Sequence, residues 1–144
     1  MKKVSDILNR KGTKMISVLP ATTVLDSLRI MADKNIGSVM VIEENKYLGL
    51  ITERDYSRKI VLKERSSTDT LVSEIMSTDL PHVKTSDTIE FCMQLMSDKN
   101  VRYLPVAENG EVIGIISIND VVKETILAQQ ETINNLQSYL YSNS

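Results

Sequence analysis

The chain has 144 residues, the size of one compact domain, and a formal net charge of −2. This charge argues against broad electrostatic binding to nucleic acid or to an anionic membrane, and no stretch is apolar for long enough to span a bilayer. The single cysteine, Cys92, excludes an intramolecular disulfide, and its place in a periodic apolar stretch favours a core residue. Because the sequence after Met1 turns polar at once and lacks an apolar signal segment, we expect a cytoplasmic protein.

One motif occurs twice. Gly-Leu-Ile-Thr-Glu-Arg-Asp over residues 49–55 returns as Gly-Ile-Ile-Ser-Ile-Asn-Asp over residues 114–120. Residues from 20 onward align without a gap with residues from 85 onward, and a shorter match pairs residues 4–8 with 72–76. We therefore predict two tandem repeats, and since each alone is too small to be more than marginally stable, we expect them to share one core. The predicted domains are repeat 1 over 1–62, a polar linker over 63–71, repeat 2 over 72–125 and a C-terminal helix over 126–144.

In the first repeat the apolar periodicity changes from helical to alternating. Thr22 or Thr23 is placed to cap a helix that buries Val24, Leu28 and Met31 and ends at Asn35. Strands over 38–42 and 47–51 follow, joined by a polar turn, and a second helix opens at the motif.

The second repeat has the same order of elements. Asp87 is the predicted cap of a helix that ends at Asn100, and strands over 103–107 and 112–117 flank an Asn-Gly turn, a strong hairpin signal. Each repeat is thus predicted to be β-α-β-β-α, and the fold class is α+β (α/β).

An apolar stripe runs along the predicted C-terminal helix at alternating spacings of four and three. Its members are Val122, Ile126, Gln129, Ile133, Leu136 and Leu140. The stripe contains too few heptads to establish a coiled coil. Packing onto the domain and pairing with a second copy are both open, and we favour the second.

The motif places a hydroxyl and a carboxylate where a strand runs into a helix. Free backbone N–H groups and the positive end of the helix dipole favour a phosphate there, and an aspartate accepts hydrogen bonds from ribose hydroxyls. The simpler alternative is a capping box, in which Thr or Ser and the Asp three residues later cap the helix reciprocally.

The two Gly-h-h-Ser/Thr-x-x-Asp motifs (h, aliphatic), in repeats over 16–58 and 81–123, resemble a pair of CBS (cystathionine-β-synthase) domains. The resemblance covers roughly residues 4–125. The run from Thr52 to Lys59 followed by Arg65-Ser66-Ser67 is most similar to stand-alone bacterial CBS-pair proteins and their mitochondrial plant relatives. The resemblance to CBS domains implies repeats packed through their sheets with a pseudo-two-fold axis. It also implies two clefts that bind adenosine ligands such as AMP, ADP, ATP, NAD or S-adenosyl-methionine.

The resemblance also implies site residues. The first cleft takes Ser117, Asn119 and Asp120, with Arg102 for phosphate and Lys14, Ile16 and Ile36 opposite. The second takes Thr52, Arg54 and Asp55, with Thr78, Leu80 and Val101 opposite. Both clefts keep an aspartate for ribose, but Gly37 stands at the position of Arg102 and Asn119 at that of Arg54. We therefore expect clefts that differ in ligand or in occupancy; the alternative for Arg102 is a solvated surface arginine.

The resulting functional hypothesis is a regulatory, energy- or redox-sensing module that binds an adenine nucleotide. We expect a homodimer with four repeats in a disc, an unidentified regulated protein, and neither a catalytic cofactor nor a metal. An enzyme is disfavoured because the sequence offers no activated nucleophile, metal-ligand set or acid/base pair beyond what the repeat explains. The alternative is a structural homodimerisation module with no physiological nucleotide.

Overall fold

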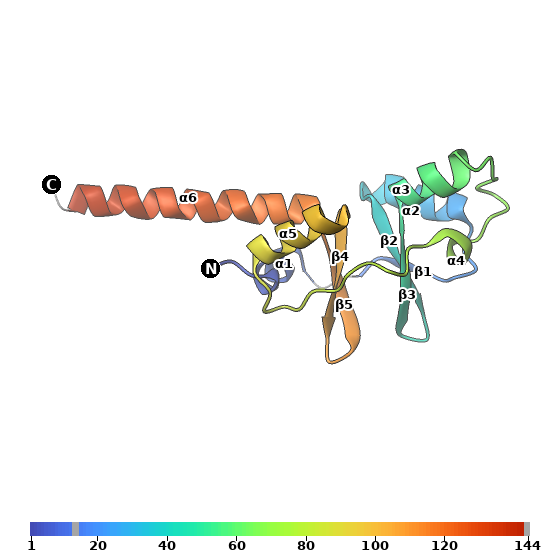
Figure 1. The fold of residues 1–144 in the computed structure, drawn as a ribbon, viewed down its shortest axis with the longest axis horizontal. Coiled ribbons are helices and arrows are strands. Elements are labelled where there is room, and N and C mark those ends of the chain that lie inside the picture. The colour runs from blue at the N-terminus through green and yellow to red at the C-terminus, as the bar shows by residue number, and fades with distance from the viewer. Residues whose placement is uncertain (13–14, 143–144) are drawn as a thin grey trace. The chain divides into compact units, whose positions relative to one another are not determined.

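The computed structural model describes residues 1–12 and 15–142. The chain folds into two compact units that do not follow the order of the repeats along the sequence (Figure 1). One unit, here called the central unit, consists of residues 14–80, and the other, the terminal unit, combines residues 1–13 with residues 81–144.

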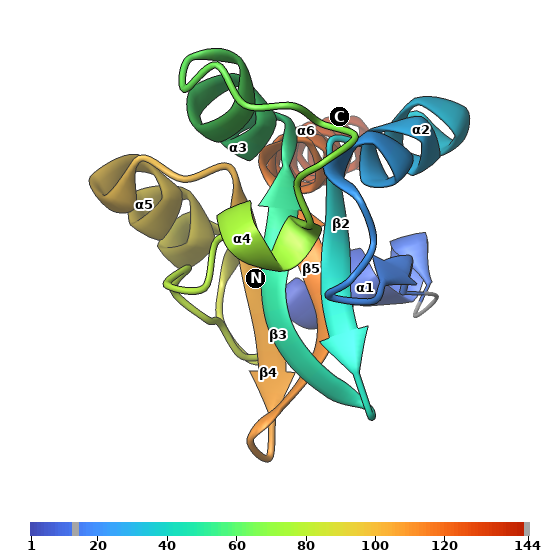
Figure 2. The same cartoon turned by 90° about the vertical axis from the view of Figure 1, so that its right-hand side faces the viewer.

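The central unit contains a three-stranded sheet and short helices. Its elements are β1 (Ser17–Val18), α2 (Val24–Lys34), β2 (Ser38–Glu43), β3 (Lys46–Thr52), α3 (Glu53–Tyr56), the π-helical turn η1 (Ser57–Val61) and α4 (Val72–Ile75). Strand β2 pairs with β1 in parallel and with β3 antiparallel. Helix α4 contacts β3 and lies beside it in Figure 2.

The terminal unit repeats this plan with a longer last helix. Its elements are α1 (Val4–Lys11), α5 (Ile89–Lys99), β4 (Tyr103–Glu108), β5 (Glu111–Ser117) and α6 (Ile118–Ser142). Strands β4 and β5 are antiparallel. The first strand expected in the second repeat is reduced to one parallel bridge between Val83 and Val106, equivalent to the pairing of Val18 with Val41.

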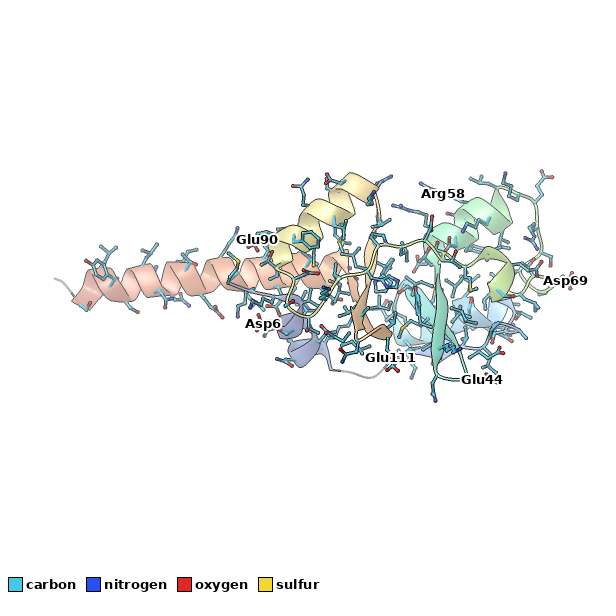
Figure 3. The ribbon with its side chains drawn as sticks, turned by 60° about the horizontal axis from the view of Figure 1, so that its bottom comes forward. Asp6, Glu44, Arg58, Asp69, Glu90 and Glu111 are labelled. Atoms are coloured by element: carbon cyan, nitrogen blue, oxygen red, sulfur yellow. The ribbon has the colours of Figure 1, made fainter. Side chains whose placement is uncertain are left out.

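The two hairpins match in detail, and all four of their predicted strands are confirmed to within a residue or so. Both central turn residues have positive φ in each hairpin, 50° and 63° at Glu44 and Asn45, and 52° and 80° at Asn109 and Gly110. This is the backbone of the tight turns that suit twisted hairpins. Figure 3 labels Glu44 in the turn of one hairpin and Glu111 just after the turn of the other.

Helices α2 and α5 begin and end as their sequences indicate, with one correction. Asn35 and Asn100 end them in the left-handed conformation, and Thr23 caps α2 by accepting from the Asp26 N–H. The prediction of Asp87 as the second cap is wrong, because Thr88 accepts from the Phe91 N–H. The Asp87 carboxylate instead accepts from the Lys84 N–H in the preceding turn.

Each unit is completed by the short helix that opens the other repeat in the sequence. The N–H of Val4, the first residue of α1, donates to the Asp87 carbonyl at 2.9 Å, and the N–H of Val72, the first of α4, donates to the Thr22 carbonyl at 2.8 Å. Helix α1 therefore closes the unit built from repeat 2, and α4 closes the unit built from repeat 1.

Most of the buried apolar side chains of the described residues belong to two clusters, one in each unit. The expectation of a core shared between the repeats stays a prediction. One cluster lies in the terminal unit and includes Val4, Ile7 and Cys92, and the other lies in the central unit and includes Val72 and Ile75. The exchange of α1 and α4 thus adds apolar side chains from one repeat to the cluster built mainly from the other.

Helix α6 continues the motif of the second repeat without a break into the predicted C-terminal helix. Within the terminal unit it contacts α1, α5 and β5, and its C-terminal part extends past α5 (Figure 1). Its buried residues are Val121 and Glu124, both in the first two turns.

Candidate functional site

The first motif turn joins β3 to α3 through a reciprocal cap. The Thr52 hydroxyl accepts from the Asp55 N–H at 3.0 Å, and the Asp55 carboxylate accepts from the Thr52 N–H at 3.1 Å and from the Thr52 hydroxyl at 2.9 Å. The capping alternative is thus confirmed for this turn. Such a cap stabilises a helix end by about 1 kcal/mol.

Both carboxylate oxygens of Asp55 are engaged inside the central unit. Oδ2 accepts the two bonds from Thr52, while Oδ1 accepts from the Ser77 hydroxyl at 2.9 Å and lies 2.8 Å from Lys59 Nζ. The side chain is only 6% exposed. Burial, and secondly the negative charge of Asp55, raises the pKa of Tyr47 to about 12. Asp55 is thus a buried carboxylate whose negative charge is balanced by Lys59 and whose two oxygens are hydrogen-bonded.

The second motif turn joins β5 to α6 with the same cap but a more accessible carboxylate. The Ser117 hydroxyl accepts from the Asp120 N–H at 3.1 Å, and Oδ2 of Asp120 accepts from the Ser117 N–H at 2.8 Å. Lys11 Nζ, from α1, donates to the same Oδ2 at 2.8 Å and to the Ile115 carbonyl at 2.9 Å. Among the described residues, every hydrogen bond to the Asp120 carboxylate goes to Oδ2, and the side chain is 22% exposed. Oδ1 is therefore the oxygen available to a ligand.

The ion-pair partners of the two aspartates come from different elements. Lys59 follows Asp55 by one helical turn, but the equivalent position four residues after Asp120 is Glu124. Glu124 is 1% exposed and pairs with Arg10 of α1, whose pKa is raised by that hydrogen bond. A carboxylate at this position cannot neutralise Asp120, so the cation is supplied by Lys11 of α1.

Arg102 lies beside the second turn, as the sequence predicts. Its carbonyl accepts from the Ile118 N–H at 2.9 Å, and the next residue, Tyr103, pairs with Ser117 across the hairpin. The side chains of Arg102 and Asn119 are exposed. The matching carbonyl in the central unit, that of Gly37, accepts from the Glu53 N–H at 3.1 Å. The terminal unit thus gathers Arg102, Ser117, Asn119 and Asp120 at one helix start.

The residues predicted to form the opposite walls of the two ligand clefts are divided between the units. Ile16 and Ile36 pack against the core of the central unit, and Val101 packs against the core of the terminal unit. Arg54, Thr78 and Leu80 also belong to the central unit but not to its core cluster. Pairing Ile16 and Ile36 with the second turn, or Val101 with the first, stays a prediction. Lys14 lies outside the described residues.

Sequence reasoning missed Lys11, Lys59 and Ser77, the partners of the two aspartates. Lys59 carried a signal, because it lies four residues after Asp55 and such pairs meet on a helix. Lys11 and Ser77 carried none, because Lys11 lies 109 residues from Asp120 and Ser77 lies 22 residues from Asp55.

Other chemistry is sparse in the part of the chain that the structure describes. Residues 1–12 and 15–142 contain no cluster of three or more His, Cys, Asp or Glu side chains placed to hold a metal ion. Over the same residues, no helix has the length and apolarity needed to cross a membrane. Cys92 is buried in the core, and that burial raises the pKa of its thiol to about 11.

Comparison with known proteins agrees with this architecture. The family model of the CBS domain matches residues 4–62 and 72–126. The mitochondrial CBS domain-containing protein CBSX3 of Arabidopsis thaliana is 34% identical over 95% of this chain and 71% of its own length. A crystal structure of a CBS domain is 40% identical, with a TM-score of 0.81 over 87% of this chain and 98% of that one.

A CBS-domain containing protein of Agrobacterium tumefaciens is 32% identical, with a TM-score of 0.81 over 86% of this chain and 99% of its own. The chain belongs to the CBS domain family and is a tandem CBS domain pair. The predicted resemblance to stand-alone CBS-pair proteins is confirmed.

Proposed function

We propose that the chain is a regulatory CBS module that binds an adenosine-containing ligand at the Ser117–Asp120 turn. The observation that carries the proposal is the difference between the two motif aspartates. Asp55 has four donors around its two oxygens, whereas Asp120 keeps Oδ1 available for the hydroxyls of a ribose.

The helices that follow the two turns support the same choice. Helix α6 has 25 residues, whereas α3 has four and runs into a π-helical turn. A long helix presents a positive dipole end, which favours a ligand phosphate. Arg102 adds a guanidinium beside that end, and Gly37 leaves the equivalent place without a cation.

The chemical class of the ligand is supported by a structural neighbour. The CBS domain pair of protein MJ0100, with a TM-score of 0.73 and 20% identity, crystallised in complex with 5′-methylthioadenosine and S-adenosyl-L-methionine. AMP, ATP, NAD and S-adenosyl-methionine all carry the ribose that a motif aspartate can hold, so they form the ligand panel. The full proposal is a cytoplasmic homodimer that binds its ligand without transforming it and reports it to a regulated protein.

Calorimetric titration of the purified chain with AMP, ATP, NAD and S-adenosyl-methionine tests the proposal. We expect a binding heat with at least one of the four. Asp120→Asn, which keeps the shape of the side chain and removes its charge, should abolish that heat. Asp55→Asn is the matched variant at the equivalent position and should retain it.

Circular dichroism of both variants separates lost binding from lost folding, because Asp55→Asn also weakens contacts inside the central unit. Loss of the heat in a folded Asp55→Asn variant, with its retention in Asp120→Asn, would assign the ligand to the other turn. If the wild-type chain gives no heat with any of the four ligands, the binding proposal fails and the structural homodimerisation module takes its place.

A further inference from the structure

Helix α1 brings two cations to the start of α6. Arg10 pairs with Glu124, and Lys11 pairs with Asp120 at 2.8 Å. The two acidic residues lie four positions apart in the first two turns of α6, and therefore on one face of the helix. Without α1, this face would present two carboxylates beside the proposed ligand site, and their charge would repel an anionic ligand.

The pair of Arg10 and Glu124 fixes the end of α1 against α6. Glu124 is only 1% exposed, and a buried carboxylate that loses its cation is strongly unfavourable, so Arg10 is held in place. Arg10 and Lys11 are adjacent in the last turn of α1, so the same contact places Lys11 against the Ser117–Asp120 turn. Lys11 Nζ also donates to the Ile115 carbonyl at 2.9 Å, which ties it to β5.

The ammonium group of Lys11 has a donor left for a ligand. An ammonium carries three N–H donors, and within the described part of the chain its hydrogen bonds, to Asp120 and to the Ile115 carbonyl, use two of them. The Lys11 side chain is 41% exposed, so the third donor is accessible from outside the protein. A ligand held at Oδ1 of Asp120 would therefore lie beside a cation that the fold has already positioned.

The equivalent cation of the central unit has no such oxygen beside it. Lys59 Nζ donates to the Ile75 carbonyl at 2.8 Å and lies 2.8 Å from Oδ1 of Asp55. That same oxygen accepts from the Ser77 hydroxyl, and Oδ2 accepts from Thr52. Both turns thus contain a neutralised aspartate, but only at Asp120 does a cation stand next to an available carboxylate oxygen.

We propose that Lys11 makes this site select adenosine ligands that carry a phosphate over those that carry none. The inference rests on the proposed function and concerns the charge of the ligand. Because Lys11 neutralises Asp120, the carboxylate can accept ribose hydroxyls without repelling a phosphate. The third donor of Lys11 can also bind a phosphate oxygen in a charge-assisted hydrogen bond. An uncharged ligand such as adenosine gains neither advantage.

Calorimetric titration of the full chain with adenosine, AMP, ATP, NAD and S-adenosyl-methionine tests this assignment. We expect at least one of the three phosphate-bearing ligands to bind about tenfold or more tightly than adenosine, as for one added charge-assisted hydrogen bond. Lys11→Met should raise the dissociation constant of that ligand by about tenfold or more, and that of adenosine by less than about threefold.

Three further variants control the measurement. Lys3→Met removes the same charge from the exposed far end of α1 and should leave the preference unchanged. Lys11→Arg keeps the charge and should restore most of the preference, which a purely structural role of the side chain would not require. Lys11→Gln is the second neutral variant if Lys11→Met alters the fold, and circular dichroism checks each protein.

The outcomes separate this inference from the proposed function. Folded neutral variants that bind the phosphate-bearing ligand as well as the wild type does, or that lose adenosine to the same extent, overturn the role of Lys11. A wild-type chain that binds adenosine or S-adenosyl-methionine as tightly as the phosphate-bearing ligands overturns it as well, while the proposed function stands. The absence of heat with every ligand refutes both.

Discussion

The glycines that open the two motifs are equivalent in sequence but lie in different surroundings, and this difference makes a quantitative prediction. A Cβ on Gly49 would lie 2.8 Å from the Ser77 carbonyl oxygen and 2.9 Å from the Met76 sulfur. A Cβ on Gly114 would meet only the Cδ2 methyl of Leu8, at 3.2 Å. Replacing each glycine by alanine therefore compares two effects in one protein: a methyl group that crowds a backbone carbonyl at position 49, and one that crowds a flexible side chain at position 114.

The expected cost at Gly49 follows from what must move. The Ser77 backbone makes two hydrogen bonds with Leu50, 2.9 Å and 2.8 Å long, and the added methyl pushes directly on one of the atoms involved. Overpacking costs about 1–3 kcal/mol, and weakened backbone bonds add up to about 1 kcal/mol each. The removal of the glycine's conformational freedom returns about 0.5–1 kcal/mol. We expect Gly49→Ala to lower the free energy of unfolding by about 2 kcal/mol.

At Gly114 the obstacle is the end of a flexible side chain, which can shift by a few tenths of an ångström. The relief of glycine entropy offsets that adjustment, so Gly114→Ala should change stability by less than about 0.5 kcal/mol. Scanning calorimetry should show Tm lowered by about 4–8 °C in the first variant and nearly unchanged in the second. Equal Tm values for the two variants would refute the reasoning from close approach.

Two further predictions concern titratable groups. Hydrogen bonds from the Thr85 hydroxyl, and to a lesser extent from the Thr85 backbone N–H, hold the pKa of Glu108 below its ordinary value of 4.5. The ionised carboxylate therefore stabilises the fold above pH 4.5, and this stabilisation is lost as the pH falls through the lowered pKa. Glu108→Gln should flatten the acid limb of stability measured by urea unfolding between pH 3 and 7, and an unchanged limb would contradict the assignment. The Cys92 thiol, with its pKa raised to about 11 by burial, should resist a thiol reagent at pH 8 and react fully in urea; rapid labelling of the folded chain would contradict its burial.

Much of the fold was predictable because its signals are local. The hairpin turn at Asn109-Gly110, the left-handed ends at Asn35 and Asn100, and the alternating strands all depend on residues within a few positions of one another. The reciprocal cap of Ser117 and Asp120 is equally local. Because the sequence is duplicated, each of these signals occurs in both repeats. The misplaced cap at Asp87 shows the limit of such reasoning, because the adjacent Thr88 competes for the same role.

The candidate site was predictable in its residues but not in its electrostatics. The motif identified Asp55 and Asp120 as equivalent carboxylates, whereas their protein partners depend on which helix returns to each turn. The exchange of α1 and α4 brings Lys11 to one aspartate and Ser77 to the other. A short sequence motif cannot predict these contacts, because the partners lie far from the aspartates along the chain.

The sequence by itself thus determined the repeat, the family, the elements and the paired motifs, because these depend on spacing and local conformational preference. Only the tertiary structure decided that the two aspartates differ in burial and in ion pairing, since both properties arise from segments that meet through folding. Asp55 is enclosed by Thr52, Lys59 and Ser77, whereas Asp120 shares one oxygen between Ser117 and Lys11. Identical motif residues acquire different chemistry because the donors around them come from different helices.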